Sequence, residues 1–132
     1  MKRTCECTFA LDPDSGRAIY LQLRDHIIAA IAGDLIREGD CLPSVRQLAR
    51  EIGVNMHTVN KAYALLAEEG FVSVEPCKGA VIVIDGDHEK ALMALREQLR
   101  ITLLEAVCRG VSREEVCRLV DEFYENCGCE KE

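Results

Sequence analysis

The sequence predicts a mainly α-helical fold with one small β-hairpin, followed by a tail of two further helices. Apolar residues between positions 18 and 66 recur in three segments at spacings of three and four, the period of an amphipathic helix. Two short runs rich in valine and isoleucine come next, FVSVE and AVIVI, with proline and glycine between them. Helical spacing then resumes after residue 85. These observations place residues 12–84 in one predicted domain and residues 85–132 in a second.

Length and composition restrict the kind of protein that this chain can be. Its 132 residues suffice for one compact domain with an appendage. Because it has three Phe, three Tyr and no Trp, we expect a core of mainly aliphatic side chains. No apolar run approaches the roughly 20 residues that span a bilayer, and the start MKRTCECTF lacks the apolar stretch of a secretory signal. We therefore expect a cytoplasmic protein without membrane contact.

The first predicted helix runs from about Ala18 to Arg37. Gly39 follows the expected end of this helix within two residues, where a helix stop is common. The apolar face of this helix is expected to consist of Tyr20, Leu23, Ile27, Ile31 and Leu35.

Two short helices joined by a tight turn are expected next. Pro43 gives an extended approach, and Ser44 is a good N-cap for the first of them. Gly53 supplies the left-handed residue that ends this helix, Asn55 caps the next one, and Gly70 closes it. The apolar positions are Val45, Leu48, Ala49 and Ile52 in the first helix, and Val59, Ala62, Tyr63 and Leu66 in the second.

The two runs rich in valine and isoleucine are expected to pair as a hairpin. The stretch PCKG between them contains Pro76 and Gly79, which are typical of turns. Three helices followed by a β-hairpin is the order of a winged helix-turn-helix, in which the hairpin is the wing. Residues 12–84 are therefore predicted to have this fold.

The tail has more apolar surface than two helices can cover. Its first helix has two apolar stripes on nearly opposite sides, and Ser112 and Glu115 have the spacing of a capping box at the start of the second. We expect another copy of the chain to cover the excess, although packing back on the helix at residues 18–37 is an alternative. The expected dimer interface comprises Leu92, Leu95, Leu99, Ile101, Leu103, Leu104, Cys108, Val116, Leu119, Val120 and Phe123.

In a helix-turn-helix the second helix lies in the DNA major groove, and its first residues reach base edges. The side chains outside the buried set of that helix are Asn55, His57, Thr58, Asn60 and Lys61. Amide and hydroxyl groups suit base edges, lysine suits phosphate, and the guanidinium of Arg46 on the preceding helix fits guanine. The alternative is that these are ordinary exposed positions, since Asn55 caps its helix with or without DNA.

Charge is distributed unevenly along the chain. The net charge of −7 argues against a polyanionic partner for the chain as a whole. Within Ser44–Lys61, however, Arg46, Arg50 and Lys61 face a single acid, Glu51. A nucleic-acid footprint needs only such a local positive patch.

The predicted winged helix-turn-helix segment resembles the DNA-binding domain of GntR-type bacterial transcription regulators. The pattern LPSVRQLA…GVN…TV…AY..L..EG carries the resemblance, which covers roughly residues 17–84. The short tail is similar to that of the YtrA branch, whose members dimerise through a small helical appendage. The resemblance implies a repressor that binds a two-fold symmetric operator in double-stranded DNA as a homodimer. It implies DNA contacts at Ser44, Arg46, Asn55, Met56, His57, Thr58, Asn60, Lys61, Lys78 and Gly79.

The sequence departs from that family pattern in the wing and at Met56. Wings of the family usually read like RRGKGTF, whereas this one reads EPCKGAV, which removes basic residues. We therefore expect a shallower salt dependence of binding, and a winged helix that binds only protein stays an open alternative. Met56 stands where a basic or polar residue is common. The tail has no room for the effector domain of other branches, so no cofactor is expected.

Eight cysteines leave a second alternative, a metal- or redox-responsive regulator. Most are expected to be reduced thiols in a cytosolic protein. The candidate metal ligands are the pairs Cys5 with Cys7 and Cys127 with Cys129, because paired thiolates bind soft metals. No Cys-x2-Cys pair or nearby Cys/His pair completes a zinc-like set, so no metal site is predicted. No enzyme is expected, because HExxH and GxSxG motifs are absent and the histidines lie in separate elements.

Overall fold

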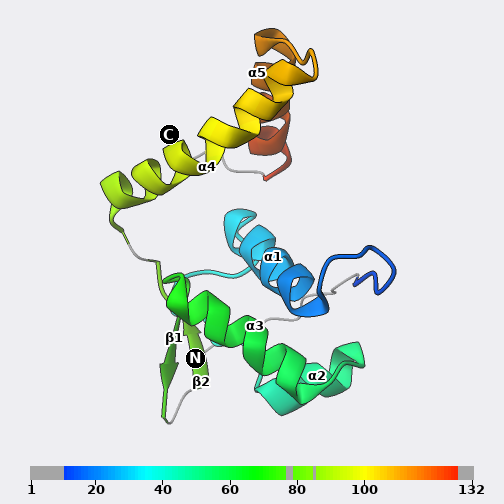
Figure 1. Cartoon of the computed structure of the whole chain (residues 1–132). Helices are drawn as coiled ribbons and strands as arrows, with labels where there is room; N and C mark the ends of the chain where they lie inside the picture. Colours follow the sequence, from blue (N-terminus) through cyan, green and yellow to red (C-terminus); the bar gives the residue numbers. More distant parts are fainter. Residues whose placement is uncertain (1–10, 77–78, 85, 128–132) are drawn as a thin grey trace. The chain divides into compact units, whose positions relative to one another are not determined.

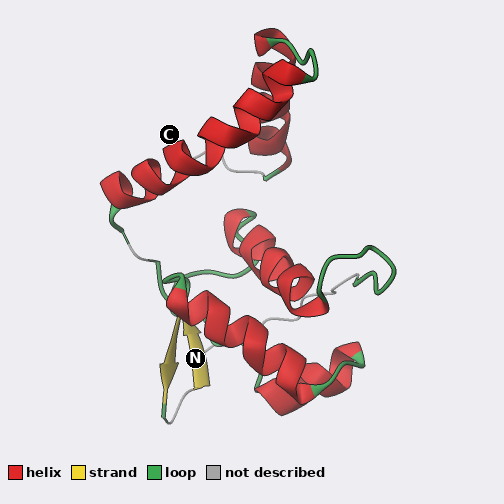
Figure 2. Ribbon diagram, in the orientation of Figure 1, coloured by secondary structure: helices red, strands yellow, loops and turns green. Residues whose placement is uncertain are grey.

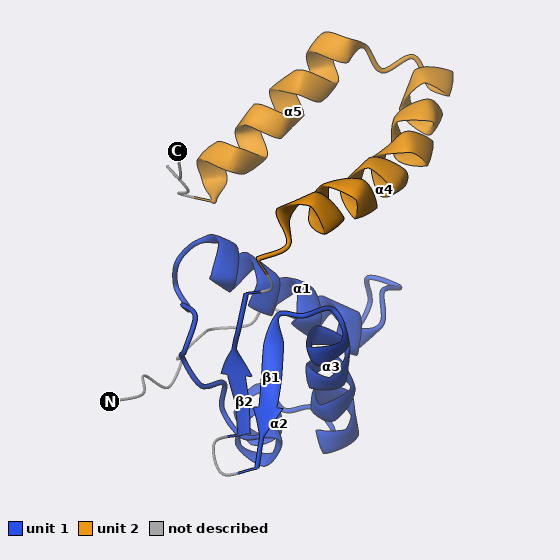
Figure 3. Cartoon of the chain, turned by 90° about the vertical axis from the view of Figure 1, so that its left-hand side faces the viewer, with its two compact units in different colours: residues 1–85 blue, residues 86–132 orange. Residues whose placement is uncertain are grey.

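The computed structural model describes residues 11–76, 79–84 and 86–127. The chain divides into two compact units, residues 1–85 and residues 86–132, shown in different colours in Figure 3. The elements are α1 (Ile19–Ala32), α2 (Val45–Ile52), α3 (Met56–Glu68), β1 (Val72–Glu75), β2 (Gly79–Ile82), α4 (His88–Cys108) and α5 (Arg113–Asn126) (Figures 1 and 2). The predicted fold class, mainly helical with one antiparallel hairpin, is confirmed.

Helix α1 ends earlier than its apolar spacing predicts. Its last residue is Ala32, and Asp34 adopts a positive φ of 61°. The backbone N–H groups of Leu35 and Ile36 both donate to the carbonyl of Ala30, which turns the chain out of the helix. As a result Leu35 is 70% exposed and Ile36 is buried in its place. The expected helical run to Arg37 and the burial of Leu35 are therefore wrong.

A side chain of α1 also fixes the segment that precedes the helix. The carboxamide of Gln22 accepts a hydrogen bond from the Asp12 N–H at 2.8 Å. Its nitrogen donates to the Asp12 carbonyl, the Ser15 hydroxyl and the Arg17 carbonyl at 2.7–2.9 Å. Residues 12–17 thus form a loop that is hydrogen-bonded to α1.

The helix-turn-helix forms as its capping residues predict. Ser44 accepts a hydrogen bond from the Gln47 N–H at the start of α2, and Asn55 accepts one from the His57 N–H at the start of α3. Gly53, with φ at 71°, ends α2 in the left-handed conformation. The predicted buried set of α3, namely Val59, Ala62, Tyr63 and Leu66, is confirmed.

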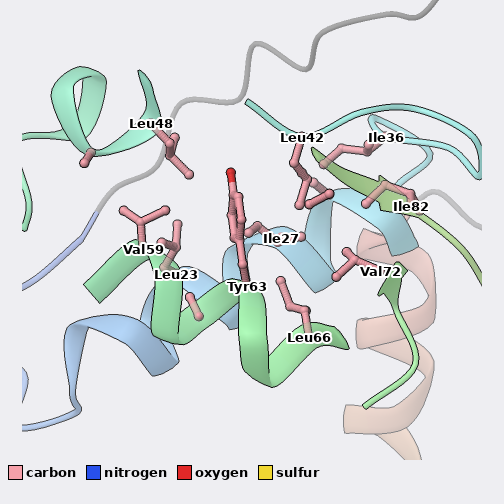
Figure 4. Close-up of a cluster of buried hydrophobic side chains, with 14 residues drawn as sticks. Leu23, Ile27, Ile36, Leu42, Leu48, Val59, Tyr63, Leu66, Val72 and Ile82 are labelled. Carbon is pink, nitrogen blue, oxygen red and sulfur yellow. The ribbon is translucent and has the colours of Figure 1, made fainter. Parts of the chain in front are cut away.

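One aliphatic core holds the N-terminal unit together (Figure 4). Tyr63 is the single aromatic side chain among the buried residues of the described ranges, and its hydroxyl donates to the Pro43 carbonyl at 2.8 Å. At the C-cap of α3, the guanidinium of Arg24 in α1 pairs with both carboxylate oxygens of Glu69 at 2.6 and 2.8 Å. These polar contacts set α1 and the start of α2 against α3. The largest fully buried side chains are Leu23, Ile27, Ile36, Leu48, Leu66, Ile82 and Val59.

The hairpin has a third partner that the sequence pattern did not reveal. Strands β1 and β2 pair from Val72 opposite Ile82 to Glu75 opposite Gly79. Compared with the predicted runs, β1 starts one residue later, and β2 starts one residue earlier and ends two residues earlier. In addition, the segment at residues 39–42 bonds to β2. The Gly39 N–H donates to the Ile82 carbonyl and the Leu42 N–H to the Ala80 carbonyl, each at 2.8 Å. The connection between α1 and α2 is therefore part of a small sheet.

The tail unit consists of two helices with exposed apolar side chains. Ser112 and Glu115 form the predicted capping box at the start of α5. None of the described residues in this unit is buried, and Leu92, Leu104 and Phe123 are 56%, 49% and 64% exposed. The unit therefore has no closed core of its own. No described helix of the chain is both long and apolar enough to span a bilayer.

Candidate nucleic-acid interface

The exposed face of α3 presents polar side chains from its first two turns. His57, Asn60 and Lys61 are exposed, Thr58 is half-buried, and Met56 is 45% exposed. Asn55 is exposed as well, and its carboxamide oxygen is used by the cap at 2.8 Å. The buried residues of α3 lie on the opposite side and dock the helix on the core. The start of α3 is thus held rigidly while its outward side chains remain accessible.

A shallow hollow separates the starts of α2 and α3. It is lined by Val45, Asn55, Met56, His57 and Asn60. Four of these five residues are sites predicted from the sequence, and Val45 is a half-buried residue of α2. The fold therefore brings most of the expected contact residues of α3 to one concave surface.

A second hollow lies beside the start of α2 and carries positive charge. It is lined by Ser44, Arg46, Gln47, Arg50 and Glu51. Arg46 and Arg50 are one turn apart and therefore share a side of α2. Neither arginine forms an ion pair with another described residue, whereas Gln47 donates to Glu51 at 3.1 Å. Both guanidinium groups are thus available to an anionic ligand.

Arg50 is a candidate contact residue that the sequence reasoning did not select. It entered that reasoning only as part of the local charge of Ser44–Lys61. The i, i+4 spacing from Arg46 was the signal that would have found it, because such residues lie on one face of a helix.

Lys61 is held by an aromatic ring from another helix. Its ammonium group lies over the ring of Tyr20 in α1, 4.2 Å from the ring centroid. This contact limits the directions that the flexible lysine side chain samples. It also connects the start of α1 to the exposed face of α3.

Of the two wing contacts that the family resemblance implies, one lies within the described residues. Gly79 is exposed at the first position of β2, where φ is 73°. It pairs with Glu75, an acid in place of the basic residue usual in the family. Lys78, the other expected wing contact, lies outside the described residues.

The candidate thiol ligands are only partly within the described residues. Cys127 is half-buried at the end of α5, while Cys5, Cys7 and Cys129 lie outside the described ranges. Within residues 11–76, 79–84 and 86–127, no group of three or more His, Cys, Asp or Glu side chains is placed to hold a metal ion.

Comparison with known proteins places the chain in a family. The model of the bacterial regulatory proteins of the gntR family matches residues 18–82. The HTH-type transcriptional repressor YtrA of Bacillus subtilis (strain 168) is 31% identical over 116 residues, which are 86% of this chain and 89% of that protein.

Two solved structures are similar over most of the chain. A transcriptional antiterminator from Listeria monocytogenes EGD-e is 31% identical with a TM-score of 0.82, and the match covers 92% of each chain. YtrA from Sulfolobus acidocaldarius, a GntR-family transcription factor, is 38% identical with a TM-score of 0.64, over 76% of this chain and 97% of the other. The chain therefore belongs to the GntR family of bacterial regulatory proteins, and it is a DNA-binding transcription regulator.

Proposed function

We propose that the chain is a transcriptional repressor that acts in the cytoplasm as a homodimer on a two-fold symmetric operator. The observation that carries the proposal is the accessible polar and basic surface at the starts of α2 and α3, which the core does not use. In a helix-turn-helix this surface faces the major groove. The similarity to a protein named as a repressor supports the direction of regulation.

The proposed DNA-binding domain is residues 12–84, and each of its contact residues has one of two roles. Exposed amide, imidazole and guanidinium groups read base edges, whereas lysine, hydroxyl groups and helix N-termini hold phosphates. We assign base reading to Arg46, His57 and Asn60, and phosphate contact to Lys61. The full proposed set is Ser44, Arg46, Arg50, Asn55, Met56, His57, Thr58, Asn60, Lys61, Lys78 and Gly79.

The proposed dimerisation tail is residues 85–132. Large apolar side chains on α4 and α5 remain between about a third and three quarters exposed, a surface that soluble proteins rarely leave uncovered. The same surface on a second copy is a self-complementary partner, as a two-fold interface requires. The proposed interface comprises Leu92, Leu95, Leu99, Ile101, Leu103, Leu104, Cys108, Val116, Leu119, Val120 and Phe123.

The proposal is tested with the protein and the DNA upstream of its own gene. Fluorescence anisotropy should show binding of that DNA, or of a duplex selected from a random pool, well above binding of shuffled DNA. Analytical ultracentrifugation should show one dimer per duplex. Equal affinity for selected and shuffled duplexes would contradict sequence-specific regulation, and one monomer per operator would contradict the dimer.

Replacement of Arg46 by alanine should weaken operator binding and relax base preference at one position. The expected loss is about 1–3 kcal/mol, as for an arginine that contacts guanine with both nitrogens. Arg46→Lys should restore little, because lysine keeps the charge but lacks the planar fork. Arg37→Ala, at an exposed arginine in the connection before α2, is the matched control. An unchanged ratio of operator to random affinity in Arg46→Ala would contradict the base-reading role.

Replacement of Lys61 by alanine should instead weaken binding to every sequence alike. Loss of one phosphate contact makes the decrease of log K with log salt concentration shallower, by about one in the slope. Tyr20→Leu should produce part of this loss, roughly twofold to fivefold in affinity, because the cation–π contact that positions the lysine is gone. Tyr20→Phe keeps the ring and should bind normally.

Measurement of Kd at several salt concentrations distinguishes these variants. Lys90→Ala, at an exposed position in α4, controls for the loss of one positive charge from the chain. A salt slope in Lys61→Ala equal to that of the unmodified protein would show that Lys61 contacts no phosphate.

A further inference from the structure

Met56 is an unusual residue for the leading edge of a DNA-reading helix. It is the first residue of α3 and remains 45% exposed, so the fold does not bury it. Its thioether is at most a weak hydrogen-bond acceptor, and it carries no charge. Met56 therefore contributes neither the hydrogen-bond pattern nor the positive charge by which such helices usually hold DNA.

The surroundings of Met56 give this side chain an apolar neighbour. Val45, the first residue of α2, lines the same hollow, and both side chains stand at the starts of their helices. Asn55, His57 and Asn60 complete the lining with polar groups. The hollow thus combines an apolar part, made by two helices, with hydrogen-bonding groups around it.

Only one feature of the major groove matches that apolar part. Base pairs present hydrogen-bond donors and acceptors there, and the 5-methyl group of thymine is the sole apolar substituent. We infer that Met56 and Val45 form a seat for the 5-methyl group of one thymine in each operator half-site. This inference rests on the proposed function, because it requires α3 to enter the major groove.

Asn60 adds a second element of selection to the same hollow. It follows Met56 by four residues and therefore lies one turn further along the same side of α3. A carboxamide pairs with the N6 and N7 groups of adenine. Together, Met56 and Asn60 select a thymine and an adjacent adenine. An arginine in place of Met56 would instead favour guanine.

The test removes the methyl group and nothing else. The full-length protein first selects operator duplexes from a random pool, and each thymine of a selected duplex is then replaced by deoxyuridine. At one position of the operator, replacing the thymine in one half-site should weaken binding roughly fourfold, and replacing it in both half-sites roughly 15-fold. These factors correspond to the burial of one methyl group in each half-site. In Met56→Ala the difference between the thymine and uracil duplexes should become much smaller, because only Val45 is left to contact the methyl group, while Met56→Leu should keep the preference for thymine.

Three outcomes would overturn the inference. A uracil scan that is flat at every position, with the selected duplex still preferred over shuffled DNA, leaves the proposed function intact and removes the methyl seat. A uracil effect of equal size in Met56→Ala and in the unmodified protein assigns the methyl contact to another side chain. Failure to prefer any duplex over shuffled DNA removes the proposed function itself. Because Met56 is exposed, both variants should fold, which circular dichroism checks.

Discussion

Removal of residues 86–132 is expected to produce a monomer that binds the operator roughly 100-fold more weakly or worse. The remaining unit should keep its fold, because every member of its buried cluster lies between Leu23 and Ile82. What the truncated chain loses is the link between two DNA-binding units. In the dimer, binding of one unit raises the local concentration of the second at the other half-site, and this advantage disappears in the monomer.

The truncation is best paired with substitutions that leave the tail in place. Leu99→Glu combined with Leu103→Glu puts two charges on one apolar stripe of α4, at side chains that are 40% and 37% exposed in the single chain. Gln98→Glu introduces one negative charge on the same helix, off both apolar stripes, and is the control, with Leu99→Glu alone as the variant of equal charge. Sedimentation equilibrium and operator Kd are the measurements. A truncated chain that still sediments as a stable dimer would place the interface in the N-terminal unit.

The second large effect is expected on stability, at Tyr63. Replacement by alanine removes a side chain that is only 5% exposed and should lower the free energy of unfolding by about 3–5 kcal/mol. Replacement by phenylalanine keeps the packing but deprives the Pro43 carbonyl of its 2.8 Å hydrogen bond, which should cost about 1–3 kcal/mol. Because Pro43 directly precedes the N-cap of α2, DNA affinity should fall as well.

Urea unfolding followed by circular dichroism measures these losses, at a fixed protein concentration because the stability of a dimer depends on it. Tyr124→Phe, at a residue that is 67% exposed, is the control. Mainly burial, and then the charge of Glu51, raises the pKa of the Tyr63 phenol. The stability that the Tyr63 phenol contributes is therefore complete below about pH 10. It declines at higher pH, because the phenol ionises at a lower pH in the unfolded chain than in the folded one. An equal alkaline loss of stability in Tyr63→Phe would contradict this assignment.

The helix-turn-helix could be predicted closely because its signals are local. Ser44, Gly53 and Asn55 act through hydrogen bonds or backbone angles within a few residues, and all three behave as their residue types suggest. The buried residues of α3 follow from the helical spacing of its apolar residues, because only one face of that helix packs on the core. The contact residues of α3 that the sequence suggests by elimination, as the side chains outside that set, stay a prediction.

The remaining features depend on contacts between distant residues. Leu35 fits the spacing of α1, but the left-handed turn at Asp34 buries the adjacent Ile36 instead, and periodicity cannot decide between two neighbouring apolar residues. The seat formed by Val45 and Met56 requires two helix starts to meet, which no spacing within one helix reveals. The position of Lys61 over Tyr20 likewise joins residues 41 positions apart in sequence.

The pairing of residues 39–42 with β2 determines how this DNA-binding unit can be transplanted. A fusion protein that stopped after α3 would retain all three helices and every predicted contact of α2 and α3. It would nevertheless leave the N–H groups of Gly39 and Leu42 without the carbonyls to which they donate, and Ile36 and Leu42 without the neighbouring Ile82. Since Leu42 leads directly into the cap of α2, the transplanted helix would lose its support. The shortest portable cassette therefore runs from Leu11, which packs on the core, through Ile82.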